Sequence, residues 1–307
     1  MEYLPPIMNL AAGVLLAPLV PGVINRVKAQ FAGRTGPPVL QAYYDLAKLL
    51  AKGAVYSTVT TWVFRAGPVV GLAAVLAGLT VLPLGGTPAI LQFPGDFLFL
   101  VFLLGLMRFL TVTAALDTGS AFEGMGASRE VQYGMLAEPA LLVSLAVVAR
   151  VTQELSLSDM LFRLAANTPH PWGGPVVLLV AAAVLVVALC ENARVPFDDP
   201  ATHLDLTMVH EVMVLDHGGV DLAFITYAAA LKSWIFGVLL AGLLLPPPPP
   251  EGAWWQGTLT AVAAVLLFAI LVGVIESVMA RLRLLRVPQL LTGAAALAII
   301  AFLTLLR

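Results

Sequence analysis

Charged side chains are scarce in this 307-residue chain. Asp, Glu, Lys and Arg make up 11% of the residues, whereas 60% are hydrophobic and the mean hydropathy is +0.96. A soluble protein, even one with an unusually large core, needs a charged surface, and these charges are too few to supply one. Most of the chain is therefore predicted to lie in lipid.

Cysteine is almost absent, because Cys190 is the only one. One cysteine excludes an internal disulfide, and by itself it ligates neither an iron–sulfur cluster nor a structural zinc ion. No Gly-rich phosphate loop of the Walker type occurs, and the net charge of −2 gives no sign of nucleic-acid binding. We therefore expect no cofactor and no metal ion in this chain and no nucleic-acid partner. Any redox centre would belong to partner subunits.

Long apolar runs are what the chain does contain. Only helices are plausible for them, because in lipid the backbone hydrogen bonds must close within each segment, and the runs lack the alternation of barrel strands. We predict an all-α polytopic protein that forms one membrane domain over residues 1–307, with a retained first helix after the acidic start MEYLPP. The runs long enough to cross about 30 Å of hydrocarbon are 7–25, 67–86, 97–117, 136–153, 175–192, 222–245, 258–280 and 288–306.

The basic residues are distributed unequally between the predicted loops. Of the 16 lysines and arginines, eleven fall on one side, three fall on the other, and Arg108 and Lys232 lie within spans. Cytoplasmic loops collect Lys and Arg. This asymmetry assigns the loops 26–66, 118–135 and 191–221 to the cytoplasm and, with eight spans, places both termini outside.

Ionisable residues also fall within or at the ends of predicted spans, where an unpaired charge is costly. Such residues form ion paths, or they fix helix register as static ion pairs; those near span ends can also be solvated at the interface. Carboxylates held in a low dielectric exchange protons near neutral pH, as a proton relay requires. The set predicts a polar seam made of Arg108, Asp117, Glu138, Glu191, Lys232 and Glu276.

The densest charge lies in Glu191–Gly219, ENARVPFDDPATHLDLTMVHEVMVLDHGG. Its histidines His203, His210 and His217 recur every seven residues, which is about 10.5 Å along a helix. Two imidazoles at that separation cannot share one metal ion. The stretch is therefore predicted to be a solvated or interface-facing acidic loop rather than a metal site.

The first cytoplasmic loop is predicted to carry an amphipathic helix that lies at the membrane surface. Apolar positions from Leu40 to Leu50 recur at helical spacing, and Asp45 and Lys48 are three residues apart and able to pair. The candidate interface of this loop comprises Arg34, Gln41, Asp45 and Lys48.

Four segments together resemble a known family. They are RTGPPVLQAYYDLAKLLAKG, FEGMGASREVQYGMLAEPA, the acidic stretch, and RLRLLRVPQLL before the last span. They are similar to the membrane subunit that anchors the peripheral arm in formate hydrogenlyase and related energy-converting NiFe hydrogenases. That protein is itself similar to subunit 1 of respiratory complex I, which carries part of the quinone site. The resemblance covers most of the chain, and the combination is highly specific.

The resemblance implies roles for individual residues. Arg129 precedes Glu138 by nine residues, and the motif E-x-x-R-x-P-F-D matches at Glu191, Arg194 and Asp198. Glu138 and Glu191 would then belong to a polar channel that leads from the arm junction to proton-pumping subunits. The cavity beneath the arm would be lined by Arg129, Arg194, Asp198, Asp199, His203, Asp205, His210, Glu211 and Asp216, and the acids after Glu191 are expected to be partly exposed in the isolated chain.

Two departures from complex I favour the hydrogenase-type branch. Complex I follows its P-F-D with closely spaced glutamates, where this chain has Ala201, His203 and Asp205, and its first loop is longer before the glutamine that Gln41 matches. Both differences argue against a quinone pocket. Asp205 also stands where hydrogenase-type relatives usually have glutamate.

The resemblance implies a subunit of a formate hydrogenlyase-like oxidoreductase complex in the cytoplasmic (inner) membrane of a prokaryote. It would anchor the electron-transfer arm and couple it to proton translocation. The implied partners are the lipid bilayer, hydrogenase-like large and small subunits, iron–sulfur subunits and antiporter-like membrane subunits; the iron–sulfur clusters and a NiFe centre would lie in those subunits. The alternatives are the quinone-site subunit of a complex I-type NADH:quinone oxidoreductase and a stand-alone ion transporter.

Overall fold

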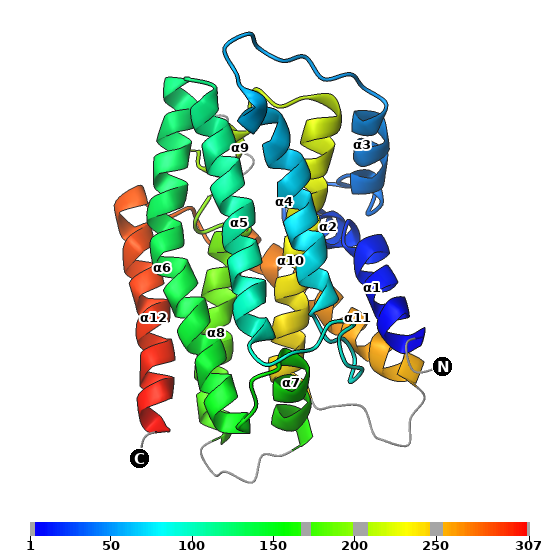
Figure 1. The fold of residues 1–307 in the computed structure, drawn as a ribbon, viewed down its shortest axis with the longest axis vertical. Helices are drawn as coiled ribbons and strands as arrows, with labels where there is room; N and C mark the ends of the chain where they lie inside the picture. The colour runs from blue at the N-terminus through cyan, green and yellow to red at the C-terminus, as the bar shows by residue number, and fades with distance from the viewer. Residues whose placement is uncertain (1–3, 167–172, 199–207, 246–253, 306–307) are drawn as a thin grey trace.

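The computed structural model describes residues 4–166, 173–198, 208–245 and 254–305. These parts of the chain are helical and contain no β-strand (Figure 1). The helices are α1 (Leu4–Leu16), α2 (Leu19–Phe31), α3 (Gln41–Leu50), α4 (Trp62–Thr80), α5 (Asp96–Asp117), α6 (Ala121–Thr152), α7 (Leu157–Ala166), α8 (Gly173–Glu191), α9 (His210–Met213), α10 (Gly219–Leu244), α11 (Trp254–Val278), the 3₁₀ turn η1 (Leu284–Arg286) and α12 (Val287–Thr304).

The all-α polytopic prediction is confirmed. Among the described residues, seven helices are long and apolar enough to cross a membrane, and the bent pair α1–α2 brings the total to eight if it counts as one span. The seven correspond to the predicted spans after the first, with ends that differ by several residues. Each closes its own backbone hydrogen bonds, as a lipid environment requires.

The first predicted span, 7–25, is not one straight helix. The chain bends by 44° between α1 and α2, at Ala17 and Pro18. Proline has no backbone N–H and its ring excludes the carbonyl four residues earlier, so the helix cannot continue through it. Hydroxyl groups satisfy the carbonyls left at the break: Tyr227 donates to Val14 at 2.7 Å, and Tyr43 donates to Leu15 at 2.5 Å.

The predicted loop 118–135 is also mostly helical. α6 begins at Ala121 and runs for 32 residues, so it starts 15 residues before the predicted span 136–153. The early part carries charged and polar side chains and therefore does not form an apolar run. This extension places Arg129 and Glu130 on the same rigid element as Glu138.

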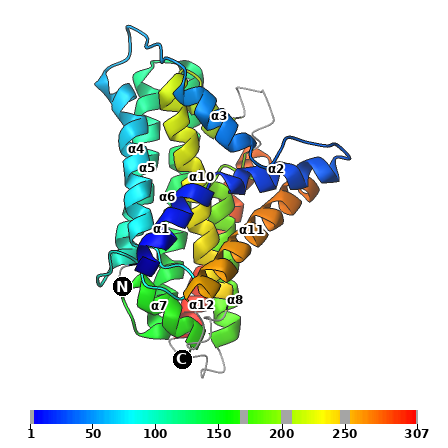
Figure 2. The same ribbon diagram turned by 90° about the vertical axis from the view of Figure 1, so that its right-hand side faces the viewer.

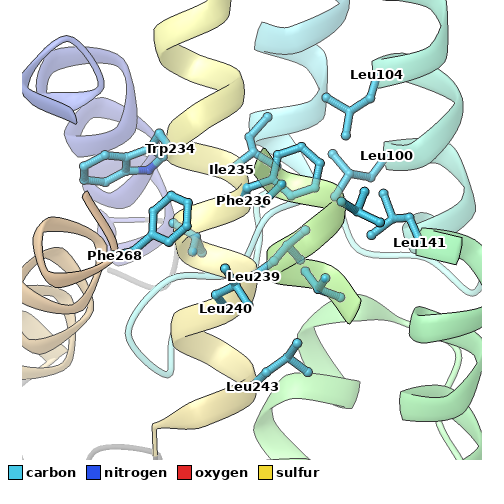
Figure 3. Close-up of a cluster of buried hydrophobic side chains, with 14 of the residues drawn as sticks. Leu100, Leu104, Leu141, Trp234, Ile235, Phe236, Leu239, Leu240, Leu243 and Phe268 are labelled. Atoms are coloured by element: carbon cyan, nitrogen blue, oxygen red, sulfur yellow. The ribbon is translucent and has the colours of Figure 1, made fainter. Parts of the chain in front are cut away.

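α10 is the central helix of the bundle (Figure 1). It packs against α4, α8 and α11, and 78% of its apolar window is buried. Figure 3 shows its side chains Trp234, Phe236 and Leu239 meeting Leu100 of α5 and Phe268 of α11. A helix that is apolar on all sides fits such a position.

Two helices depart from the upright bundle. α11 is tilted and packs along α2, and the two end together at one side of the molecule (Figure 2). Gly273 permits this close approach, because a Cβ there would lie 2.8 Å from the Cβ of Val27. The start of α1 and the end of α12 lie at the same end of the bundle (Figures 1 and 2). We call the opposite end, which carries α3, α9 and the α5–α6 turn, the basic end.

Candidate functional site

Five ionisable side chains from four helices meet inside the bundle. Arg108 of α5 contacts Glu130 and Glu138 of α6 and Glu191 at the end of α8, and Lys232 of α10 contacts Glu191. Arg108 Nη1 lies 2.5 Å from Glu138 Oε1, Arg108 Nε lies 3.4 Å from Glu130 Oε1, and Lys232 Nζ lies 3.7 Å from Glu191 Oε2. Arg108 Nη2 also donates to Glu191. We call these five residues the charge cluster.

The sequence places these side chains together by helical spacing and by one small residue. Glu130 and Glu138 are eight residues apart on α6, which brings them near the same face two turns apart. Gly134 lies between them and leaves space for the arginine, because a Cβ there would lie 2.3 Å from Arg108 Nη1 and 3.0 Å from Arg108 Cδ. The guanidinium therefore crosses α6 at Gly134 and reaches Glu191 on the far side.

The Gly134 space yields a prediction. Gly134→Ala should displace the guanidinium that three carboxylates hold, and it should lower the free energy of unfolding by about 1–3 kcal/mol, as for other overpacked sites. The matched control is Gly124→Ala in the same helix, where an added Cβ meets nothing within 4 Å. That change should be neutral or slightly stabilising. Thermal unfolding of the purified protein in detergent measures both; equal midpoints for the two variants would contradict the role given to Gly134.

Glu130 was not among the residues predicted from the sequence. It stands outside the predicted span 136–153, so the search for charges within apolar runs did not reach it. The available signal was its eight-residue spacing from Glu138, which is informative only once α6 is known to begin at Ala121. The structure brings together four of the six predicted seam residues, namely Arg108, Glu138, Glu191 and Lys232.

Glu276 and Asp117 make other contacts. Glu276 of α11 is buried and pairs with Lys28 of α2 at 2.7 Å and with Arg194 at 3.5 Å. Asp117, at the end of α5, accepts hydrogen bonds from the backbone N–H of Thr61 at 2.7 Å and from the Thr61 hydroxyl at 2.9 Å. It therefore holds the start of α4, as a carboxylate at a helix N-terminus does.

The turn after α8 is bound to the chain that follows α11. Asp198 is 3% exposed, and Arg281 lies 3.0 Å from its Oδ1. Its Oδ2 accepts the backbone N–H groups of Val209 at 3.0 Å and His210 at 3.1 Å. The backbone N–H of Leu282 donates to the carbonyl of Pro196 at 3.0 Å. Asp198 thus joins three segments.

The burial of Asp198 corrects one expectation. The acids that follow Glu191 were expected to be partly exposed, and this is so for Asp216 and for the half-buried Glu211 but not for Asp198. A buried carboxylate is stable there because it is paired with a cation and accepts two N–H groups. The predicted residues Asp199, His203 and Asp205 lie outside the described residues.

The remaining junction residues gather around the same turn. Arg129 donates to the carbonyl of Met208 at 2.8 Å, so α6 reaches the chain before α9. Partial burial, together with the positive charges of Lys232 and Arg194, lowers the pKa of His210 to about 4. His210 is therefore neutral at pH 7 and lies within electrostatic reach of both the charge cluster and the Glu276 pair.

The predicted amphipathic helix of the first loop is present as α3. None of its residues is fully buried, and Arg34 before it is exposed. Asp45 accepts a hydrogen bond from Gln41 at 2.9 Å, and no ion pair with Lys48 forms among the described residues. The helix is joined to α1 through the Tyr43 hydroxyl.

Fold and site define a class: an all-α, multi-pass membrane protein with a buried set of three carboxylates and two cations across four helices. The chain belongs to the NADH dehydrogenase family, whose model matches residues 6–306.

Full-length relatives and a solved structure agree with this family. Formate hydrogenlyase subunit 4 of Escherichia coli K12 is 30% identical over 100% of this chain and 99% of its own length. Hydrogenase-4 component C of the same organism is 31% identical over 86% of this chain and 82% of its length. A subunit of the NADH-quinone oxidoreductase of Anaplasma phagocytophilum is 28% identical over 61% and 60%. A chain in the membrane-bound sulfane sulfur reductase, an archaeal respiratory membrane complex, has the same fold, with a TM-score of 0.84 at 18% identity over 99% of both chains.

Proposed function

We propose that this chain is the membrane subunit of a hydrogenase-type, formate hydrogenlyase-like oxidoreductase complex. It anchors the peripheral electron-transfer arm and couples that arm to proton translocation. The observation that carries the proposal is the charge cluster, which lies inside the bundle below the turn that holds Asp198. The relatives over the full chain support the hydrogenase type.

The charge balance of the cluster suits a proton carrier. Three carboxylates face two cations, so with every group ionised the cluster has one uncompensated negative charge. A proton shared among the carboxylates removes that charge, and coupled carboxylates bind such a proton as a set. A change of charge near Asp198 or His210 would shift the occupancy of this proton.

The exposure of Glu138 supports a partner within the membrane. Its side chain is 39% exposed although it lies near the middle of α6. A carboxylate that faces lipid at that depth is costly, so such groups usually face a protein or water-filled space. An antiporter-like membrane subunit packed over Glu138 would cover it and receive the proton.

The arm would dock at the basic end. The loops 26–66, 118–135 and 191–221 meet there, and the excess of Lys and Arg assigns this end to the cytoplasm and both termini to the outside of an inner membrane. Docking there would place hydrogenase-like large and small subunits and iron–sulfur subunits above Asp198. Those subunits would hold the redox centres.

Replacing Glu191 tests the coupling role. Glu191→Gln keeps the size and one hydrogen-bond acceptor, so assembly should be retained, while coupled activity should fall about tenfold or more because a proton-transfer group is lost. The control is Glu154→Gln, which removes an acid paired with Arg163 at the opposite end of the bundle. Coupled activity is measured in sealed vesicles with and without an uncoupler. Unchanged coupled activity of Glu191→Gln in a tightly coupled preparation would rule out the relay.

A second candidate is a quinone-site subunit, which the similarity to an NADH-quinone oxidoreductase subunit favours. The two differ in electron acceptor. Activity that depends on added quinone would select the second candidate, whereas copurification with a large subunit that has its four nickel-ligating cysteines would select the first.

A further inference from the structure

The ends of α2 and α11 form a projecting corner of the molecule. Both helices lean away from the bundle and end side by side (Figure 2). They remain in contact close to their ends, because Lys28 pairs with Glu276 at 2.7 Å and a Cβ on Gly273 would touch Val27. We call this corner the basic tip; its exposed residues are Arg26, Phe31, Arg34, Val278, Met279, Arg283, Leu285 and Arg286.

The basic tip combines exposed arginines with exposed apolar side chains. Val278 is 70% exposed and Leu285 is 87% exposed, and both stand within a few residues of Arg283 and Arg286. Neither segment of the tip, 26–34 or 277–290, contains an acidic residue. The nearest acid in the chain, Glu276, is buried and faces two cations. The exposed charge of these segments is therefore positive.

The position of the tip matches a membrane surface. Two candidate membrane helices end there, and α12 begins at Val287, directly after Arg286. At such a depth the apolar side chains can enter the acyl region while the guanidinium groups reach the headgroups. The tip also points away from Asp198 and α9, where the arm is proposed to dock (Figure 2).

We propose that the basic tip binds anionic phospholipids. Arginine forms paired hydrogen bonds with phosphate, and clusters of Lys and Arg at the cytoplasmic surface attract anionic lipid headgroups. Leu285 and Val278 hold the tip against the acyl chains, and Arg283 and Arg286 hold the phosphates. The proposal needs only the membrane placement of the chain and stands apart from the proposed function.

The test uses the assembled complex, purified and stripped of lipid, and phosphatidylglycerol as the probe. The variant R283Q/R286Q removes two arginines of the tip, and the control K48Q/K52Q removes two exposed lysines at the same end of the bundle. We expect R283Q/R286Q to weaken phosphatidylglycerol binding about tenfold or more, as two surface arginines contribute. The control should bind as the native complex does, and phosphatidylcholine should show no difference among the three.

Further measurements protect the result from a folding defect. Leu285→Glu changes a side chain that contacts little protein, so the fold should persist while phosphatidylglycerol binding falls. Native mass spectrometry then counts the anionic lipids and the subunits in each preparation. Equal affinity of R283Q/R286Q and native complex would overturn the proposal. Loss of arm subunits from R283Q/R286Q would overturn it too, because it would assign the tip to a protein partner.

Discussion

Replacement of Arg108 by methionine is expected to destabilise the protein by about 3–5 kcal/mol, the usual cost of removing one partner from buried ion pairs. Without the guanidinium, Glu130, Glu138 and Glu191 would face only the ammonium of Lys232. Thermal unfolding in detergent should show the loss. It should shrink as the pH is lowered, because protonated carboxyl groups no longer need a cation.

The control for this variant is Arg163→Met. Arg163 pairs with Glu154 at 2.6 Å, but its side chain is 54% exposed, so the pair contributes at most about 1 kcal/mol. Adding Glu191→Gln to Arg108→Met should recover part of the stability by removing one unpaired carboxylate. If Arg108→Met were as stable as Arg163→Met, the cluster would not be held together by this arginine.

Asp198→Ala has the second-largest expected effect. The change leaves the N–H groups of Val209 and His210 without their acceptor and Arg281 without the carboxylate it faces. We expect a loss of about 2–4 kcal/mol, since each buried group left unsatisfied costs about 1–3 kcal/mol. The loss should be local, because the bonds join a turn to neighbouring segments rather than helix to helix.

Amide hydrogen exchange measures this local effect directly. The amides of Val209 and His210 should exchange faster in Asp198→Ala, and the arm should be held less tightly in the purified complex. Asp216→Ala, which removes an exposed acid of the same loop, should change stability by no more than about 0.5 kcal/mol. Unchanged exchange at Val209 and His210 in Asp198→Ala would show that other contacts hold the turn.

Both predictions depend on details that the sequence could only partly reveal. The charges within spans identified Arg108, Glu138, Glu191 and Lys232, since an ionisable residue in an apolar run needs a partner. Glu130 escaped, because α6 continues into a stretch that is not apolar. Glu276 was correctly expected to be paired or hydrated, but its partners are Lys28 and Arg194, which come from distant parts of the chain.

By itself, the sequence determined the class of fold, the approximate places of the membrane helices and the family, because hydrophobic length and local motifs depend only on neighbouring residues. The tertiary structure decided which charges meet, how Pro18 bends the first span, and that Asp198 is buried. These outcomes depend on crossing geometry and on spaces such as that at Gly134, where a missing side chain lets an arginine from another helix pass. Such contacts join residues far apart in the chain, and no local pattern encodes them.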